Sequence, residues 1–340
     1  MGTRRTILSL LAGCLVSGLA PSAHADVAPV PGWARPAVTW AANRNYIDRD
    51  TFRPNVAMSR WAFGRLMKKA FGGGYSRTGG SVTAAEVDRT LVQRLRQGAT
   101  ARSLASVKSP DGWDPGISER DGFEIVAREL GLRFDRPTNE EQFEASAGDP
   151  LRKADVVYAL WKAKTDPDMW AVDVLDNFVL GNLGPRQRSV VKFAFDQVGS
   201  PYVWAGEWKF KTPPGYPYGA QAAGGFDCSG LVWYVMQRKS SSYSPPNRRY
   251  SGWSIPQRSS ADIARAAPKR LYYKQLAPGD LLVFGDNGRQ SSVSSIYHTA
   301  IYMGRGWMIH STGSRNGVSV AYLGPGSWWR DEFAWGRRVF

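Results

Sequence analysis

The side chains suited to nucleophilic catalysis are few in this 340-residue chain. It has two cysteines, Cys14 and Cys228, and three histidines, His24, His298 and His310. A cysteine thiolate is a strong nucleophile, and a neighbouring imidazole is the usual base that activates it. Because Cys14 and His24 fall in an N-terminal stretch typical of an export signal, Cys228, His298 and His310 are the candidate catalytic set.

The sequence around Cys228 predicts a helix that begins at the thiol. It reads Phe-Asp-Cys-Ser-Gly-Leu-Val over residues 226–232. Asp227 or Ser229 can cap the helix start, and Gly230 permits close approach of another backbone. A cysteine in the first turn faces the positive end of the helix, which favours the thiolate.

The two histidines lie on neighbouring predicted strands. His298 is in the apolar stretch 297–303, His310 ends the stretch 307–310, and Gly304-Arg305-Gly306 between them predicts a hairpin. Both imidazoles can then face one side, where one deprotonates Cys228 and the other orients the first. Two other interpretations stay open: these residues are ordinary core residues, or they form a Cys-His-His site for zinc or copper.

The order of predicted elements indicates an α+β fold. Residues 33–182 read as mostly helical, Asn182–Pro185 reads as a linker, and strands dominate after it. The predicted helices are 58–71, 83–95, 118–130, 151–163, 188–198 and 228–237, and the predicted strands are 280–284, 297–303, 307–311, 318–323 and 334–340.

Three of the predicted helices share a similar preceding sequence. Each follows a Pro-containing turn and a basic residue, with the helical stretches beginning near Ser59, Glu119 and Arg152. This pattern resembles degenerate S-layer-homology repeats, which implies a helical domain that binds wall polymers. The family's binding motif is altered in all three copies, so no binding residue is assigned. The alternative is a plain helical accessory domain.

The N-terminus reads as an export signal of residues 1–25. Arg4 and Arg5 precede an apolar run, and Ala23-His24-Ala25 offers small residues for cleavage before Asp26. The arginine pair resembles a twin-arginine signal, whereas the residues ending in Cys14 resemble a lipobox. All these interpretations place the protein outside the cytoplasm, in the cell wall or beyond it. No later stretch is long and apolar enough to predict a transmembrane helix.

The formal net charge of +15 is unevenly distributed. Residues 186–340 contain 20 Lys+Arg against 8 Asp+Glu, whereas residues 26–185 contain 22 against 21. A basic C-terminal half favours an anionic partner. For an exported protein, wall polymers and peptidoglycan carboxylates fit better than nucleic acid, which is not expected as a partner.

The C-terminal half is similar to the NlpC/P60 family of papain-like cysteine peptidases. The resemblance rests on motifs in the same order as in the family: 199–206 (Gly-Ser-Pro-Tyr-Val-Trp-Ala-Gly), 226–230, 276–284, 298–304 and 308–310. It implies a helix bearing the cysteine, packed on an antiparallel sheet bearing the histidine. It also implies hydrolysis of peptidoglycan stem peptides, commonly between D-γ-glutamyl and a diamino acid, with no cofactor and no metal.

The resemblance also implies roles for individual residues. Cys228 is the expected nucleophile, His298 the general base and His310 the orienting residue. The positions of Tyr202, Asp227 and Ser229 match those that shape the substrate site. The chain departs from the family pattern at Ala205, at Thr299-Ala300 and in the insertion 207–225, which puts cleavage-site preference in doubt.

The sequence therefore predicts three parts: a signal peptide (1–25), a helical accessory domain (26–182) and a cysteine peptidase domain (186–340). The predicted function is that of an exported peptidoglycan endopeptidase acting on stem peptides. Two alternatives remain open. One is a catalytically silent wall-binding protein, and the other is an amidase or acyltransferase on the same fold.

Overall fold

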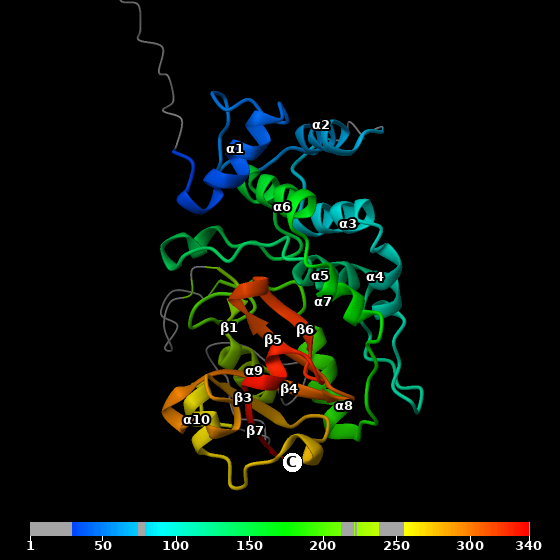
Figure 1. Cartoon of the computed structure of the whole chain (residues 1–340), viewed down its shortest axis with the longest axis vertical. Helices are drawn as coiled ribbons and strands as arrows, with labels where there is room; N and C mark the ends of the chain where they lie inside the picture. The colour runs from blue at the N-terminus through cyan, green and yellow to red at the C-terminus, as the bar shows by residue number, and fades with distance from the viewer. Residues whose placement is uncertain (1–28, 74–78, 212–220, 222, 238–254, 340) are drawn as a thin grey trace, which may run out of the picture.

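The computed structural model describes residues 29–73, 79–211, 221, 223–237 and 255–339, so the predicted signal 1–25 lies outside the described residues. The first half of the described chain is helical and is stacked on a second half that contains the sheet (Figure 1). Its helices are α1 (Arg35–Asn43), α2 (Arg60–Phe71), α3 (Ala84–Arg94), α4 (Gly98–Ala105), α5 (Glu119–Glu129), α6 (Lys153–Thr165) and α7 (Met169–Leu175), with the short 3-10 turns η1 (Gly32–Ala34) and η2 (Thr138–Phe143).

Side-chain caps set the starts of three of the predicted helices. The Ser59 side chain accepts the Ala62 N–H, so α2 begins at Arg60. Thr83 with Glu86 forms a capping box at α3, and Ser118 with Asp121 forms one at α5. The helices α1, α4 and α7 were not predicted.

Extended segments that precede three of the helices meet in space. The Met58 N–H donates to the Leu151 carbonyl, Leu151 N–H to Val82, and Val82 N–H to Met58, each at 2.9 Å. These segments precede α2, α6 and α3. The resemblance to S-layer-homology repeats grouped the segments before α2 and α6 with the segment before α5. In the structure, the segment that meets the first two is instead the one before α3.

The second half contains an antiparallel five-stranded sheet, as the sequence predicted. The strand order is β6 (Gly317–Tyr322), β5 (Trp307–Thr312), β4 (Ile296–Gly304), β3 (Leu281–Gly285) and β7 (Phe333–Arg337). Around it lie α8 (Pro185–Phe195), α9 (Cys228–Gln237), α10 (Ser260–Arg265) and α11 (Trp328–Glu332), and a separate ribbon pairs β1 (Glu207–Trp208) with β2 (Gly225–Phe226).

Both faces of the sheet are buried. Leu231 and Val235 of α9 belong to the main core together with Ile301 and Ile309 of the sheet. On the other face a smaller cluster forms from Leu282, Phe284, Ala300, Tyr302, Met308, Ala321, Leu323 and Phe333, against which Trp329 of α11 packs. This burial fixes α9 against β4 and β5, which is the arrangement that positions the candidate site.

The two halves are joined by buried polar contacts as well as by the core. Ser319 of β6 donates to Glu129 of α5 at 2.7 Å, and Arg315 donates to the Glu129 carbonyl at 2.8 Å. The expected linker 182–185 is packed: Leu183 is 3% exposed, and α8 starts at Pro185. It is therefore part of the folded structure, and the predicted domain boundary at this position stays a prediction.

Within the described residues, none of the helices combines the length and apolar character of a membrane span.

Candidate active site

Cys228 is the first residue of α9, as the sequence predicted. The Asp227 carboxylate accepts the Gly230 N–H and so caps the helix start. The Asp227 N–H donates to the Gly206 carbonyl oxygen at 2.9 Å, and a Cβ on Gly230 would lie 1.9 Å from that same oxygen. Only glycine at 230 lets this turn of α9 approach the Gly206 backbone.

The thiol lies against the strand that carries His298. Its Sγ atom is 3.9 Å from the Tyr297 carbonyl oxygen, and the Thr299 N–H is hydrogen-bonded to it. Tyr297 and Thr299 are the two chain neighbours of His298. The structure therefore brings Cys228 and His298 to the same end of β4 although they are 70 positions apart in the sequence.

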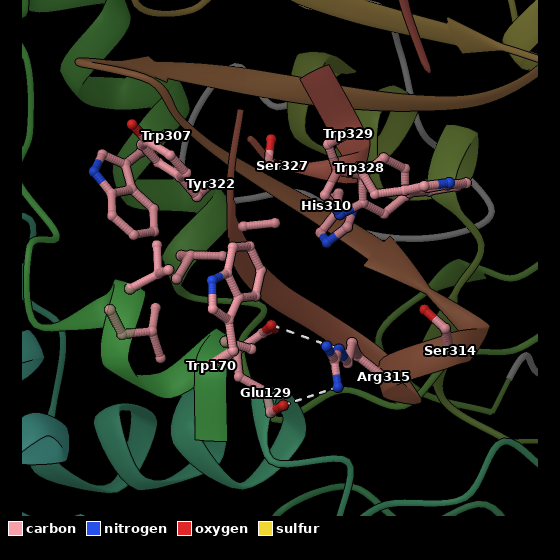
Figure 2. Close-up of a pocket in the computed structure, with 15 residues that line it drawn as sticks. Glu129, Trp170, Trp307, His310, Ser314, Arg315, Tyr322, Ser327, Trp328 and Trp329 are labelled. Atoms are coloured by element: carbon pink, nitrogen blue, oxygen red, sulfur yellow. Dashed lines mark hydrogen bonds and ion pairs between the residues drawn. The ribbon is translucent and has the colours of Figure 1, made fainter. Parts of the chain in front are cut away.

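His298 and His310 form a buried hydrogen-bonded pair. The distance from His298 Nε2 to His310 Nδ1 is 2.9 Å, and the two residues are 6% and 1% exposed. Trp329 packs on both rings, with centroids 4.7 Å from His298 and 4.8 Å from His310. Figure 2 shows Trp329 lying beside His310. The hairpin thus places both imidazoles on one side of the sheet.

The hydrogen bond between the rings constrains their tautomers. If His298 is to accept a proton at Nδ1, its proton must be on Nε2, which then donates to His310 Nδ1. His310 must in turn carry its proton on Nε2. That atom is buried and has no hydrogen-bond partner within the described residues. With this pair of tautomers His298 Nδ1 can accept a proton, and one donor at His310 is left unsatisfied.

Burial makes the neutral forms of Cys228 and His298 dominant. Burial, then the charge of Asp227, raises the pKa of the thiol to about 12, although Thr299, Ser229 and Arg258 act in the opposite direction. Burial lowers the pKa of His298 to about 3. Burial therefore opposes the thiolate that the helix start was expected to favour.

These shifts predict an unusually flat pH profile. His298 must be neutral to act as a base, and its lowered pKa keeps it neutral well below the usual range. The raised thiol pKa moves ionisation of Cys228 to high pH. We expect kcat/KM for a soluble peptide substrate to stay within about twofold from roughly pH 5 to pH 9. Limbs near pH 6 and pH 8 would instead indicate a thiolate–imidazolium pair.

The control for this profile is the circular dichroism spectrum at each pH. Burial raises the pKa of both Glu124 and Glu144 to about 7. A carboxyl group whose pKa is raised on folding stabilises the fold at low pH, and this stabilisation is lost as pH rises through the folded pKa. Rates are therefore compared only where the spectrum is unchanged.

Arg258 organises the residues around the start of α9. It donates from Nη1 to Asp227 Oδ1 at 3.1 Å and to Ser229 Oγ at 2.8 Å, and from Nε to Glu207 Oε2 at 2.7 Å. From Nη2 it also donates to the carbonyl oxygens of Ala205 and Gly206, at 2.9 and 3.1 Å, and to Asp227 Oδ2. We call Glu207, Asp227, Ser229 and Arg258 the Arg258 cluster.

Arg258 was not among the predicted site residues. In the sequence, Arg258 lies between Pro256 and Ser259, the residue that caps α10. Neither of these residues predicts a contact between Arg258 and Asp227, which is 31 positions earlier. The cluster also changes how Asp227 and Ser229 are understood. Their side chains are engaged by Arg258, so they fix the backbone beside Cys228.

Tyr202 lies beside the thiol and is tied to both halves of the molecule. Its N–H donates to Asn316 Oδ1 at 3.0 Å, while Asn316 Nδ2 donates to the Phe134 carbonyl at 2.6 Å. Burial, then the charge of Cys228, raises the pKa of Tyr202 above its usual range. Tyr202 therefore remains a neutral phenol next to the nucleophile.

The insertion 207–225 is described only near its ends. Glu207 and Trp208 pair with Phe226 and Gly225, so the insertion leaves and rejoins the fold immediately before the cysteine. The Gln221 amide donates to the carbonyl oxygens of Trp208, Ala223 and Gly225. These bonds hold the base of the insertion in a fixed position.

No metal site is found in the part of the chain that the structure describes. None of its His, Cys, Asp and Glu side chains gather in a group of three or more that could hold an ion. Cys228, His298 and His310 therefore do not form the metal-binding cluster considered as an alternative.

The geometry is a thiol at a helix start with two hydrogen-bonded imidazoles on adjacent strands, which are the residue types that a nucleophile, a base and an orienting residue require. The comparison with family models decides which family this arrangement represents. Residues 199–337 match the NlpC/P60 family. The NlpC/P60 match includes Cys228, His298 and His310, and the expected α+β fold is confirmed for this region.

Similar proteins are named as endopeptidases and as a peptidoglycan hydrolase. A probable endopeptidase of Mycobacterium tuberculosis is 34% identical over 137 residues, covering 40% of this chain and 26% of its own. The bifunctional muramidase/DL-endopeptidase CwlT of Bacillus subtilis is 29% identical over 181 residues, 51% of this chain and 44% of its own. The solved structure of the peptidoglycan hydrolase RipB from Mycobacterium tuberculosis is 24% identical, covers 48% of this chain and 74% of its own, and has a TM-score of 0.33.

The chain spans less than half the length of these curated relatives. The resemblance of the helical half to S-layer-homology repeats receives no support from the family comparison, which matches residues 199–337.

Proposed function

We propose that this protein is an exported peptidoglycan hydrolase that cuts an amide bond of the stem peptide through a cysteine nucleophile. The observation that carries the proposal is the buried hydrogen bond between His298 and His310 at the end of the strand that contacts the Cys228 thiol. The names of the NlpC/P60 relatives support peptidoglycan as the substrate.

The proposed reaction has two halves. His298 Nδ1 removes the thiol proton as Cys228 Sγ attacks the scissile carbonyl carbon. The imidazolium then returns that proton to the leaving amine, and a thioester remains on Cys228. In the second half His298 takes a proton from water as the resulting hydroxide attacks the thioester carbonyl. The C–S bond breaks, the imidazolium returns the proton to the departing Cys228 sulfur, and a free carboxyl group and the thiol result. His310 keeps the His298 ring oriented in both halves.

The oxyanion is held at the start of α9. The Cys228 N–H has no acceptor among the described residues, and it belongs to the first turn of α9, at the positive helix terminus. A backbone donor at this position stabilises negative charge only as it develops on the carbonyl oxygen.

We assign Tyr202, Asp227 and Ser229 to the acyl side of the substrate site, with Asp227 and Ser229 acting through the Arg258 cluster. Replacing Arg258 by lysine retains the charge but removes the planar fork that reaches Asp227, Ser229 and Gly206 together. We expect kcat/KM to fall by about 10- to 100-fold, because small displacements of a catalytic group are costly.

The matched control for Arg258→Lys is Arg265→Lys. Arg265 also forms an ion pair with an aspartate, Asp262, but its side chain is 64% exposed on α10. Exposed pairs contribute little, so this control should retain full activity. Equal activity of Arg258→Lys and wild type in steady-state assays would show that the cluster does not position the nucleophile.

The finer features of the proposal concern the rest of the chain. Residues 1–25 direct export, by the twin-arginine route or otherwise. The helical half, proposed to be related to S-layer-homology repeats, holds the protein at the wall, and the basic C-terminal half attracts anionic wall polymers. The bond cleaved is D-γ-glutamyl–diamino acid, and the insertion 207–225 modifies the choice of cleavage site.

The test is incubation of purified peptidoglycan with the mature chain, followed by sedimentation and by measurement of newly released amino groups. Release of amino groups supports the hydrolase. Sedimentation with the wall but no release would overturn it and favour a catalytically silent wall-binding protein.

A further inference from the structure

A cavity of about 280 Å³ lies between α7 of the helical half, the edge strand β6 and α11. Figure 2 shows Trp170 on one side of it and Trp328 and Trp329 on the other. Neither Cys228 nor His298 is among its lining residues, so the cavity is a site apart from the proposed nucleophile and base. Its volume is just below the usual range of small-molecule sites, so it holds one compact ring.

Exposed and buried aromatic side chains line the cavity. Trp170 of α7 and Trp328 of α11 are each 58% exposed, whereas Trp307 of β5 is buried. The face of an aromatic ring carries partial negative charge and attracts the weakly positive C–H groups of a ligand. Two exposed indoles beside a cavity therefore favour a ligand with an apolar face of C–H groups, which a saturated ring presents and a flexible chain does not.

The charged side chains of the lining are already compensated. They are Glu129 and Arg315. Arg315 Nη2 is 2.5 Å from Asp168 and its Nε is 3.6 Å from Glu129, and Ser319 donates to Glu129 at 2.7 Å. Taking another ion out of water is costly unless a free opposite charge receives it. The lining therefore favours a neutral ligand over one that carries an ammonium, carboxylate or phosphate group.

His310 supplies the polar group that selects among neutral ligands. Its ring lines the cavity, and in Figure 2 it projects from β5 toward the space above Trp170 and Arg315. It is 1% exposed, and its Nε2 atom has no partner among the described residues. In the tautomer that lets His298 act as a base this atom is a donor, and an unsatisfied buried donor is costly. A carbonyl oxygen in the cavity satisfies it after a small movement of the lining.

These requirements meet in one class of molecule. The ligand is a saturated ring with a face of C–H groups, it has no charge, and it carries a carbonyl oxygen. An N-acetylated hexosamine has all three properties. A plain hexose has no such carbonyl group, and an amino acid with a basic or acidic side chain carries a charge.

We propose that the cavity between α7 and α11 binds one N-acetylated hexosamine ring of a polysaccharide. The ring lies on the indoles of Trp170 and Trp328, and its acetamido oxygen accepts from His310 Nε2. The site goes beyond the proposed function, because it recognises a sugar and not the peptide bond that is cut. Through Trp170, the helical half contributes to this sugar site.

Isothermal titration calorimetry with the purified protein tests the proposal, since its signal does not depend on the tryptophans that are replaced. The probes are N,N′-diacetylchitobiose and cellobiose, which share the same linkage and differ in having an acetamido or a hydroxyl group on each ring. We expect saturable binding of diacetylchitobiose, at least about tenfold tighter than that of cellobiose, which leaves His310 Nε2 unsatisfied. Trp170→Ala is expected to weaken binding about tenfold.

A third probe identifies the source of the sugar. It is the disaccharide of N-acetylglucosamine and N-acetylmuramic acid, used as its neutral methyl ester. Binding as tight as that of diacetylchitobiose assigns the site to the glycan of peptidoglycan. Weaker binding assigns it to another N-acetylated polysaccharide.

Trp61→Ala is the matched control, since Trp61 is an exposed tryptophan of α2 that does not line this cavity. Absence of saturable binding of diacetylchitobiose, equal affinity for cellobiose, or equal loss in Trp61→Ala and Trp170→Ala would overturn the proposal. Stem-peptide hydrolysis without sugar binding would remove the sugar site alone. Trp170-dependent sugar binding without any hydrolysis would remove the proposed hydrolase and leave the sugar site.

Discussion

Replacing Cys228 by alanine is expected to lower the hydrolysis of stem peptides by about 10⁴-fold or more. Loss of a nucleophile removes the covalent route entirely and leaves only binding and the oxyanion donor. The scheme contains no other thiol, because Cys228 is the one free cysteine in the described residues. The rate of amine release from a soluble stem peptide is the quantity to compare between variant and wild type.

Cys228→Ser is the control for the size and shape of the side chain. It replaces the thiol with a hydroxyl group of similar size that is a far weaker nucleophile. The thermal midpoints of the two variants and wild type should agree, since the core contacts of α9 come from residues such as Leu231 and Val235. Activity of Cys228→Ala within tenfold of wild type would show that the thiol is not the nucleophile.

Replacing Arg128 by methionine is expected to destabilise the fold by about 3–5 kcal/mol. Arg128 and Glu124 are one turn apart on α5, 3.5 Å from each other, and both side chains are fully buried. Arg128 also donates to the Arg315 carbonyl across the contact between the two halves. Removing Arg128 takes away one of the positive charges that stabilise the buried Glu124 carboxylate, so this carboxylate is left poorly compensated. Denaturant unfolding followed by circular dichroism measures the change.

Two further variants separate the buried pair from other effects of substitution. In Arg128→Met with Glu124→Leu, both charges are removed, so most of the lost stability should return. In Arg120→Met, an arginine that is 61% exposed on the same helix is replaced, and the change should stay below about 0.5 kcal/mol. A single Arg128→Met variant as stable as wild type would mean that the pair contributes nothing to the fold.

The elements that carry the candidate site could be predicted because each has a local signal. Short apolar runs separated by Gly, Asn or Pro predicted strands β3 to β7, and a capping Asp227 or Ser229 predicted that Cys228 lies in the first turn of a helix. The turn at Gly304–Gly306 predicted the hairpin that brings His298 to His310. These signals depend on residues near each other in the sequence.

The features that were missed depend on contacts between distant segments. Arg258 reaches Asp227 and Glu207 through side-chain geometry that no spacing encodes. The helix α7, seven residues long, is too short to show an apolar period, so Trp170 could not be placed near β6. The neutral state of Cys228 follows from burial by the whole fold, whereas the sequence shows only the helix terminus.

The central claim is that Cys228 hydrolyses an amide within the stem peptide. It is tested most directly by mass spectrometry of peptidoglycan fragments after incubation with wild type and with Cys228→Ala. The account predicts new fragments from wild type alone, in pairs whose summed mass exceeds the uncut peptide by one water and whose new ends lie inside the stem peptide. The same fragments from Cys228→Ala, or release of the intact stem peptide from the glycan, would contradict it.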